Sequence, residues 1–227
     1  MRGQSDSRGN RTMLPAAFSD LSIIFHGEDN FVDIHPDARI GPLRLEFHGS
    51  HSRFIVGPTY AEEKQKAFSS TVRIGEDCEV RIGCNVSTTA RCFIGVSEGV
   101  CLTIGDDCML ASGVQLRADD SHTIFDVRTG MRANPSQDIV IGRHVWLADG
   151  VRVLKGSRIG DGSVIGVGSV VTDVIPNNCV AVGSPARVVR RDIAWERSCL
   201  WPSRHPPAYK PDASFVERTG YWGLTED

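Results

Sequence analysis

One histidine in a polar, acidic segment is the first group in this sequence that could do chemistry. His122 follows Asp119, Asp120 and Ser121, and Asp126 comes four residues later. Imidazole exchanges a proton near neutral pH, so such a histidine can act as a general acid or base. A carboxylate on the far ring nitrogen would fix the tautomer. A lone loop histidine is more often only solvated, so the residue types alone leave both interpretations open.

The elements that must position this segment are set by a six-residue repeat. Branched aliphatic residues recur at every sixth position, namely Ile141, Leu147, Val153, Ile159, Ile165 and Val171. A period of six fits neither the 3.6-residue helix nor the alternation of a single strand. It predicts an all-β solenoid, a parallel β-helix in which three hexads close a triangular coil. Each aliphatic residue then lies on the one 18 residues further on, at a strand spacing of about 4.8 Å.

A second block of hexads precedes this one. The frame extends back from Leu116 to Ile74, with Glu98 as its one misfit. It places four of the seven cysteines at inward positions, namely Cys78, Cys84, Cys92 and Cys108. The chain has no CxxC pair, so we expect buried free thiols rather than a disulfide framework or a zinc site.

The two blocks are out of phase, because the 25 residues from Leu116 to Ile141 are not a multiple of six. We therefore expect residues 117–138, which are rich in Asp, Arg, Ser and Asn, to leave the solenoid as an excursion loop. Binding and catalytic groups tend to lie on such loops, and His122 is in this one. Trp146 stands one residue before an inward position, so its indole should point outward from the solenoid.

Composition excludes several partners. The net charge is -3 and no Lys/Arg-rich run occurs, so no nucleic-acid partner is expected. No apolar run approaches the roughly 20 residues of a membrane span. The N-terminal sequence MRGQSDSRGNRTM lacks the apolar core of a signal peptide, so a cytoplasmic location is expected.

The pattern along the chain predicts four regions. We expect a disordered segment over residues 1–12, N-terminal strands and first irregular coils over 13–73, the β-helix domain over 74–183, and a C-terminal cap and tail over 184–227. Leu43, Leu45 and Phe47 alternate like a strand. Pro185 could start a short C-terminal helix, and the Pro-rich tail from Pro202 could cap the solenoid or a neighbour.

Motifs in the second half of the chain resemble the hexapeptide-repeat acetyltransferases. The resemblance covers roughly residues 74–195 and rests on IGRHVW, LKGSRIGDGSVIGVGSVVTDVIP and VGSPARVVR. Within that family, DDSHTIFD followed by NPSQDIVIGRHVWLADGV is most similar to the polysaccharide O-acetyltransferases of capsule and lipopolysaccharide pathways, including the polysialic acid type. The resemblance implies a left-handed parallel β-helix, acetyl-CoA as co-substrate, and a homotrimer with sites between subunits.

The resemblance also implies roles for single residues. It makes His122 the catalytic base, since the family's catalytic histidine stands where the loop leaves the helix. It places Trp146 at the site, although cover by the loop or a neighbouring subunit would equally explain an outward tryptophan. The positions that match the family's CoA contacts are Trp146, Asp149, Val167, Thr172, Arg187 and Arg190. Asp173 stands where the family commonly has a basic residue, which weakens the case for a phosphate contact there. His144 has no motif support and is expected to be structural.

These inferences predict an acetyl-CoA-dependent O-acetyltransferase that acts on a hydroxyl of a sugar or polysaccharide. Transfer should be direct, because no cysteine lies in the excursion and Ser121 matches no nucleophile motif. No metal is expected. One alternative is an antibiotic or a nucleotide-sugar amine as acceptor. A γ-class carbonic anhydrase would need three zinc histidines, of which the chain offers only His122 and His144. A non-catalytic solenoid is the last alternative.

Overall fold

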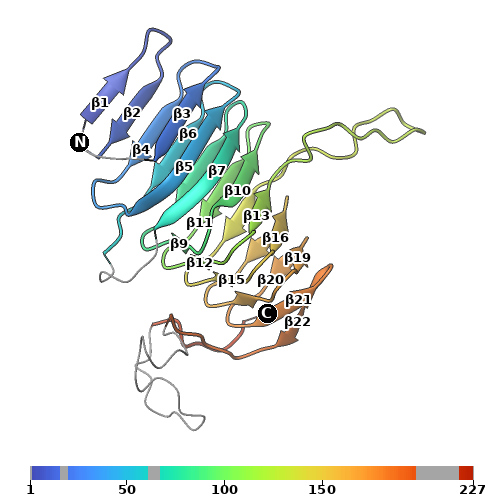
Figure 1. Ribbon diagram of the computed structural model, residues 1–227. Helices are drawn as coiled ribbons and strands as arrows, with labels where there is room; N and C mark the ends of the chain where they lie inside the picture. Colours follow the sequence, from blue (N-terminus) through green and yellow to red (C-terminus); the bar gives the residue numbers. More distant parts are fainter. Residues whose placement is uncertain (1, 16–19, 61–66, 198–219, 227) are drawn as a thin grey trace.

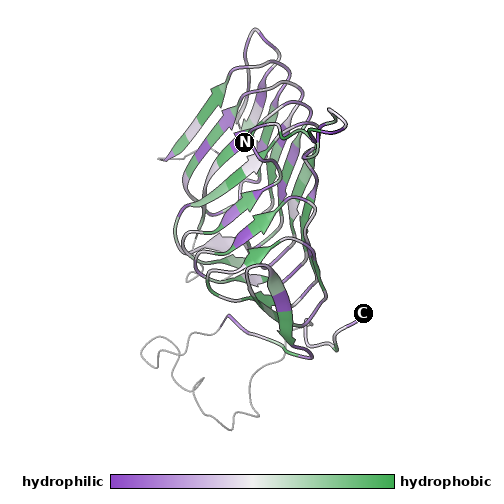
Figure 2. Ribbon diagram, turned by 90° about the vertical axis from the view of Figure 1, so that its right-hand side faces the viewer, coloured by the Kyte–Doolittle hydropathy of each residue, from purple (hydrophilic) through white to green (hydrophobic). Residues whose placement is uncertain are grey.

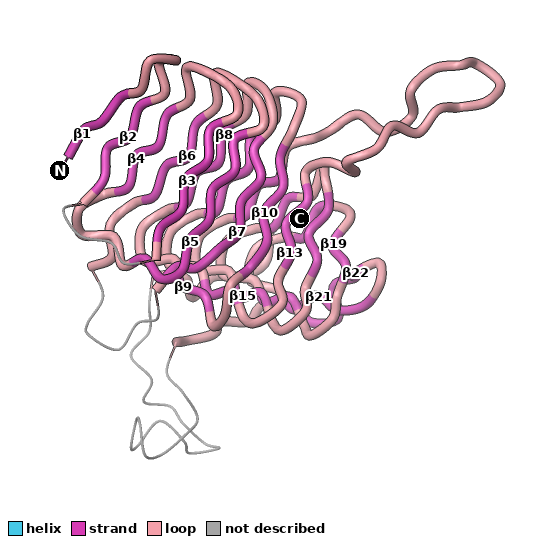
Figure 3. The backbone as a smooth tube through the Cα atoms, turned by 45° about the horizontal axis from the view of Figure 1, so that its top comes forward, coloured by secondary structure: helices cyan, strands magenta, loops and turns pink. Residues whose placement is uncertain are grey.

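Three parallel sheets wind into a β-helix whose coils stack along one axis (Figure 1). The computed structural model describes residues 2–15, 20–60, 67–197 and 220–226, and this part of the chain contains strands and no helix. Successive strands pass from one sheet to the next, as the backbone trace in Figure 3 shows. No helix in the described part is long and apolar enough to cross a membrane.

The strands are distributed over a nine-stranded, a seven-stranded and a six-stranded sheet, named A, B and C. Sheet A contains β1 (Arg2–Ser5), β2 (Arg11–Leu14), β4 (Phe31–Ile34), β6 (Arg53–Val56), β8 (Glu79–Ile82), β11 (Cys101–Ile104), β14 (Ile139–Ile141), β17 (Arg158–Ile159) and β20 (Val174–Ile175). Sheet B contains β3 (Leu21–Phe25), β5 (Ile40–Phe47), β7 (Phe68–Ile74), β10 (Cys92–Val96), β13 (Gln115–Arg117), β16 (Arg152–Leu154) and β19 (Val170–Val171). Sheet C contains β9 (Ser87–Thr88), β12 (Met109–Leu110), β15 (Trp146–Leu147), β18 (Val164–Ile165), β21 (Val180–Gly183) and β22 (Ala186–Arg190).

The core is the stack of inward aliphatic residues. All six repeat positions from Ile141 to Val171 are buried, and Val153 pairs with Val171 in the register that the 18-residue coil predicts. Hydrophobic and hydrophilic residues alternate along the strands (Figure 2), because successive side chains of a strand point to opposite faces. Leu43, Leu45 and Phe47 of β5 are buried as predicted.

The coils before the excursion are longer than the hexad frame predicts. Val72 pairs with Ile94 and Ile94 with Leu116, so these coils repeat every 22 residues rather than every 18. The extra residues lengthen the strands of sheets A and B: β10 and β11 have five and four residues, whereas β16 and β17 of the later coils have three and two. Between strands the chain turns at corners where residues have positive φ. Glu98, with φ +65°, is exposed at such a corner and is not an inward residue. The continuous hexad frame was therefore wrong in this part of the chain.

The predicted burial of the cysteines is confirmed for three of the four. Cys78, Cys92 and Cys108 are buried free thiols, whereas Cys84 is half-buried. Burial raises the pKa of Cys92 to about 11 and that of Cys108 to about 12. Thiols with these pKa values are not nucleophiles near neutral pH.

The N-terminal segment is ordered, against the prediction of disorder over residues 1–12. Strands β1 and β2 form an antiparallel pair at the edge of sheet A. Asn10 holds the turn between them: its buried amide donates to Asp6 Oδ2 at 2.9 Å and to the Gly27 carbonyl of the next coil at 3.1 Å. Sheets A and B continue without a break across residue 73, so residues 21–73 are the first coils of the same solenoid.

The C-terminal cap is built from strand and coil. No helix starts at Pro185 itself: residues Ala186 to Arg190, which include the β-branched Val188 and Val189, form β22 and pair antiparallel with β21. Residues 220–226 dock on the last coil, where Asn178 Nδ2 donates to the Tyr221 carbonyl at 2.6 Å and Thr225 Oγ1 to the Asn178 carbonyl at 2.9 Å. The Pro-rich stretch from Pro202 to residue 219 lies outside the described residues.

Candidate active site

The excursion leaves the solenoid between β13 and β14, at the corner where sheet B passes into sheet A, and projects far from the coils (Figure 1). Glu98, in the preceding coil, fixes the segment of the excursion that returns to the solenoid. The Glu98 carboxylate accepts hydrogen bonds from both terminal nitrogens of Arg132 and from the backbone N and Oγ of Ser136. The Arg132 hydrogen bond, together with those from Ser136, lowers the pKa of Glu98 to about 2. Glu98, the one residue that did not fit the six-residue frame, therefore anchors the excursion to the solenoid.

Asn134 positions the backbone around His122. Its buried amide donates to the His122 carbonyl and to Asp120 Oδ2, both at 2.8 Å, and accepts from the Ile124 amide at 2.7 Å. Lys155, from the coil below, pairs with the same Asp120 oxygen and donates to the Asn134 carbonyl at 3.2 Å. The hydrogen bond from Lys155 is the largest of the causes that lower the pKa of Asp120. Lys155 thus ties both the outgoing and the returning segment of the excursion to the solenoid, close to the His122 backbone.

The His122 side chain is exposed at this point. Its ring forms no hydrogen bond with the described residues, and no carboxylate among them lies within ion-pair distance of it. Asp119 bonds Ser121, Asp120 bonds Lys155, and Asp126 closes the turn at residues 128 and 129. The orienting carboxylate that a hydrolase-like triad would use is therefore not supplied by the neighbours of His122 within one chain. An exposed imidazole on an anchored backbone is free to meet a substrate hydroxyl.

A pocket of about 220 Å³ opens at the base of the excursion, and its lining reaches as far as Ser121, the residue before His122. It lies on the outer face of sheet B, where Arg73, Phe93 and Arg117 project from β7, β10 and β13. Asp119 and Ser121 of the excursion form its rim. A molecule in this pocket would therefore contact the segment that leads into His122.

Trp146 lies on sheet C rather than beside the excursion. Its half-buried indole packs on the core and against the ring of Trp195, at 5.9 Å between centroids. Within one chain the structure does not bring it together with His122. A site that uses both residues needs a second copy of the chain.

The residues matched to CoA contacts lie on two corners and at the C-terminal end. Asp149 and Val167 are exposed at the corner where sheet C passes into sheet B, and Asp149 Oδ1 accepts from the Ser112 amide at 2.8 Å. Thr172 follows Val171 at the corner that also carries the excursion. Arg187 and Arg190 are exposed on β22. Val167 is 75% exposed, like several other apolar side chains of the described residues.

His144 is structural, as predicted. It is 1% exposed, and its ring is stacked between Trp195 and Tyr221, with centroids at 4.0 and 4.4 Å. Its Nδ1 lies 2.6 Å from Asp107 Oδ2 and its Nε2 lies 2.9 Å from the Trp195 carbonyl. Burial opposes ionisation of Asp107, but hydrogen bonds from His144 and Arg197 outweigh it and lower the pKa of that carboxyl. Because both ring nitrogens are engaged, His144 has none left for a zinc ion shared with His122.

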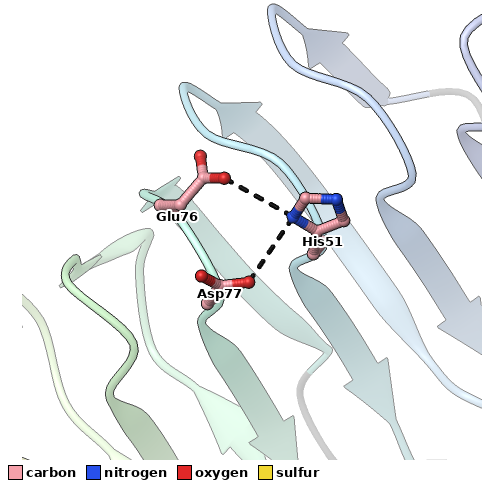
Figure 4. Close-up of side chains that lie close together, drawn as sticks. All are labelled: His51, Glu76 and Asp77. Carbon is pink, nitrogen blue, oxygen red and sulfur yellow. Dashed lines mark ion pairs between the residues drawn. The ribbon is translucent and has the colours of Figure 1, made fainter.

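One group in the described part of the chain has the composition of a metal site. The ligand atoms of His51, Glu76 and Asp77 all lie within 4.8 Å of one another, and Nδ1 of His51 is 3.5 Å from an oxygen of each carboxylate (Figure 4). All three side chains are exposed. Glu76 also accepts a hydrogen bond from the Ser50 amide at 2.8 Å. The group is thus explained as an ion-pair cluster at a corner, and it includes neither His122 nor His144.

Comparison with known proteins assigns the chain to a family. The six-repeat model of the bacterial transferase hexapeptide matches residues 138–173. The polysialic acid O-acetyltransferase of Neisseria meningitidis is 31% identical over 188 residues, which are 75% of this chain and 87% of that protein. The chain therefore belongs to the hexapeptide-repeat O-acetyltransferases. The predictions of a left-handed parallel β-helix and of an O-acetyltransferase are confirmed.

Two further relatives define the branch of the family. The solved structure of the polySia-specific acetyltransferase NeuO superposes with a TM-score of 0.74 at 31% identity, over 86% of this chain and 89% of that chain. A polysialic acid O-acetyltransferase of Escherichia coli O1:K1 is 47% identical over 112 residues. That match spans 49% of this chain and 36% of the length of the relative.

Three residues of this site were missed by sequence reasoning. Asn134 lies in the NPSQD motif that carried the resemblance, so the motif was the available signal. Lys155 comes from the next coil, and Arg73 precedes the excursion by more than one coil. No spacing in the sequence indicates that they meet the excursion.

Proposed function

We propose that the chain transfers the acetyl group of acetyl-CoA to a hydroxyl group of an acidic polysaccharide. The observation that carries this proposal is the exposed imidazole of His122 on an anchored backbone, beside an open pocket. The relatives named as polysialic acid O-acetyltransferases support the choice of acceptor. His122 removes the hydroxyl proton while the hydroxyl oxygen attacks the thioester carbonyl. The proton then passes to the departing CoA sulfur, and no acetyl-enzyme forms.

The proposed CoA site uses Trp146, Asp149, Val167, Thr172, Arg187 and Arg190. Exposed positions along sheet C and the two corners suit an extended pantetheine arm, and Arg187 and Arg190 suit phosphate oxygens. Trp146 belongs to this site and packs against the arm or a sugar ring. Because Trp146 and His122 lie on different sides of one solenoid, each complete site is formed by His122 of one subunit and Trp146 of its neighbour.

This arrangement requires an oligomer, which we propose to be a homotrimer. The tip of the excursion exposes apolar side chains that a second subunit would cover: Ile124, Phe125, Val127 and Met131, with Val127 97% exposed. Three copies related by a threefold axis close a ring of identical contacts. Light scattering should report a trimer, and a stable monomer at micromolar concentration would contradict the shared site.

The direct test is release of free thiol from acetyl-CoA in the presence of a panel of acidic glycans, neutral sugars and amine-bearing antibiotics. We expect thiol release to depend on an acidic glycan, and mass spectrometry should find the acetyl group as an ester on that glycan. Transfer to an amine alone would overturn the proposal. Trapping of an acetylated residue after incubation with acetyl-CoA alone would contradict direct transfer.

A further inference from the structure

The pocket beside His122 is formed by a row of three residues on adjacent strands. In the parallel register, Gly95 of β10 pairs with Arg73 of β7 on one side and Arg117 of β13 on the other. Residues in register on neighbouring strands share one face of a sheet, so the row presents two arginines separated by a position without a side chain. The two arginines thus flank a hollow in the outer face of sheet B.

Phe93 fills the floor of this hollow and holds both arginines. Its ring centroid is 5.8 Å from the guanidinium carbon of Arg73 and 5.0 Å from that of Arg117. A Cβ atom at Gly95 would lie 3.2 Å from the same ring, tighter than ordinary contact. A guanidinium group that lies over an aromatic face keeps its N–H groups at its edge for an anion. The glycine and the ring therefore shape the pocket between the two cations.

The protein neutralises these two arginines only in part. Among the described residues, no carboxylate lies within ion-pair distance of Arg117, and Arg73 shares its one partner, Glu46 at 3.4 Å, with Arg44. The pocket has one carboxylate of its own, Asp119. Asp119 Oδ1 is engaged by the backbone N of Ser121 at 2.8 Å and by its Oγ at 3.2 Å. Asp119 Oδ2 lies 3.5 Å from where a Cβ atom of Gly95 would stand, so this carboxylate also faces the hollow. The hollow therefore has two guanidinium groups against one carboxylate of its own, an excess of positive charge at the base of the excursion.

We propose that Arg73 and Arg117 bind the carboxylate of an acidic sugar unit and so present a hydroxyl of that unit, or of its neighbour, to His122. Guanidinium groups match the two oxygens of a carboxylate, and the Phe93 ring offers an apolar face to the sugar. This inference rests on the proposed function, since it assigns the acceptor subsite of that reaction. It makes the Arg73–Phe93–Arg117 pocket the element that selects acidic over neutral acceptors.

The test compares an acidic glycan with its neutral form. The probes are an oligomer of α2,8-linked sialic acid and the same oligomer with its carboxyl groups reduced to alcohols. The enzymes are wild type, Arg117→Gln, Arg73→Gln and, as matched control, Arg158→Gln. Arg158 is an exposed arginine on sheet A that does not line the pocket. Initial rates of thiol release give KM for the glycan and, separately, KM for acetyl-CoA.

We expect Arg117→Gln to raise the KM for the acidic oligomer by about 10-fold to 100-fold, the loss typical of a hydrogen bond to a charged group. Its KM for acetyl-CoA should not change, and Arg158→Gln should resemble wild type. Reduction of the carboxyl groups should raise the wild-type KM by a similar factor but have little effect on Arg117→Gln. If Arg117→Gln still prefers the acidic oligomer as strongly as wild type does, the subsite is refuted.

Two further outcomes separate this inference from the proposed function. If the wild type acetylates the reduced oligomer as well as the acidic one, the acceptor subsite is wrong while the acetyltransferase activity stands. If no glycan stimulates thiol release, the proposed function fails first. Circular dichroism confirms that each variant is folded. If Arg117→Gln is not folded, Arg73→Gln alone decides, because its side chain lies on a different strand.

Discussion

The excursion and the coil that directly follows it each hold a histidine, and the two differ in burial, in hydrogen bonding and in ring contacts. His122 is exposed, with its backbone held by Asn134 and its ring without a partner in the described residues. His144 is buried, with both ring nitrogens bonded and both faces stacked. A catalytic base must be positioned through its backbone so that its ring can reach substrate. A structural histidine instead uses its ring to join segments that are distant in sequence.

Replacement of His122 by Ala should have the largest effect. We expect turnover to fall by about 10²- to 10⁴-fold, the usual contribution of a positioned general base. Binding of acetyl-CoA and the thermal midpoint should stay near wild type, because the side chain is exposed. Steady-state kinetics and calorimetric titration with acetyl-CoA measure both quantities. Near-full activity of this variant would remove His122 from the mechanism.

The same replacement at His144 should act on stability. His144→Ala removes one of the two side-chain partners of the half-buried Asp107 carboxylate and the ring contact to the Trp195 carbonyl, and it opens a cavity between two rings. We expect a loss of about 2–4 kcal/mol in the free energy of unfolding. Denaturant titration measures it. An unfolding free energy equal to wild type would show that the stack and the Asp107 contact do not hold the C-terminal segment.

Removal of the Lys155 anchor should give a smaller loss, and one confined to catalysis. Lys155→Met releases Asp120 and the Asn134 carbonyl, so the His122 backbone loses one of its supports. We expect turnover to fall by about 10-fold, since small misplacements of catalytic groups are costly. Lys155→Arg should recover much of the rate by restoring the charge. A normal rate for Lys155→Met would show that Asn134 alone positions His122.

Trp146 tests whether the site lies between subunits. Trp146→Ala should raise the KM for acetyl-CoA or for the glycan by about 3-fold to 10-fold, in keeping with the loss of an aromatic contact. The solenoid should remain folded. Mixed oligomers of Trp146→Ala and His122→Ala should recover part of the activity, because some sites then contain both native residues. Unchanged KM values for both substrates would exclude Trp146 from the site.

The smallest expected effect is the contribution of the Glu98 anchor to stability, which depends on pH. Its pKa of about 2 in the folded chain lies below the usual value for Glu, so Glu98 favours the anchored state above the ordinary pKa. This contribution is lost as pH falls through the folded value. Wild type and Glu98→Gln should therefore differ in stability above about pH 4.5, and the difference should disappear toward pH 2. Since the pair is largely exposed, the difference should be small and should shrink in high salt. A difference that grows on acidification would reverse the assigned sign.

The amino-acid sequence by itself determined the solenoid. Aliphatic residues at every sixth position are all buried when short strands turn at each hexad and the strands of successive coils stack in register. The repeat is visible within a single coil, so the sequence alone is enough to predict it. The excursion was also visible, because it breaks the phase of the repeat. The same reasoning failed before the excursion: the 22-residue coils have longer strands in sheets A and B, so the six-residue frame shifted there and counted Glu98 as an inward position. It also missed strands β1 and β2 within residues 2–14, where Asn10 forms hydrogen bonds with the next coil.

Only the tertiary structure decided which residues meet. Lys155, Glu98 and Arg73 reach the excursion or its pocket because parallel stacking brings the same corner or face of successive coils together, at separations that the excursion itself alters. The pairing of His144 with Trp195 and Tyr221 likewise depends on where the C-terminal segment docks. These contacts form between coils rather than within them, so no local pattern encodes them. The positions of the two histidines relative to Trp146 follow from the winding of the three sheets, which separates His122 from Trp146 within one chain.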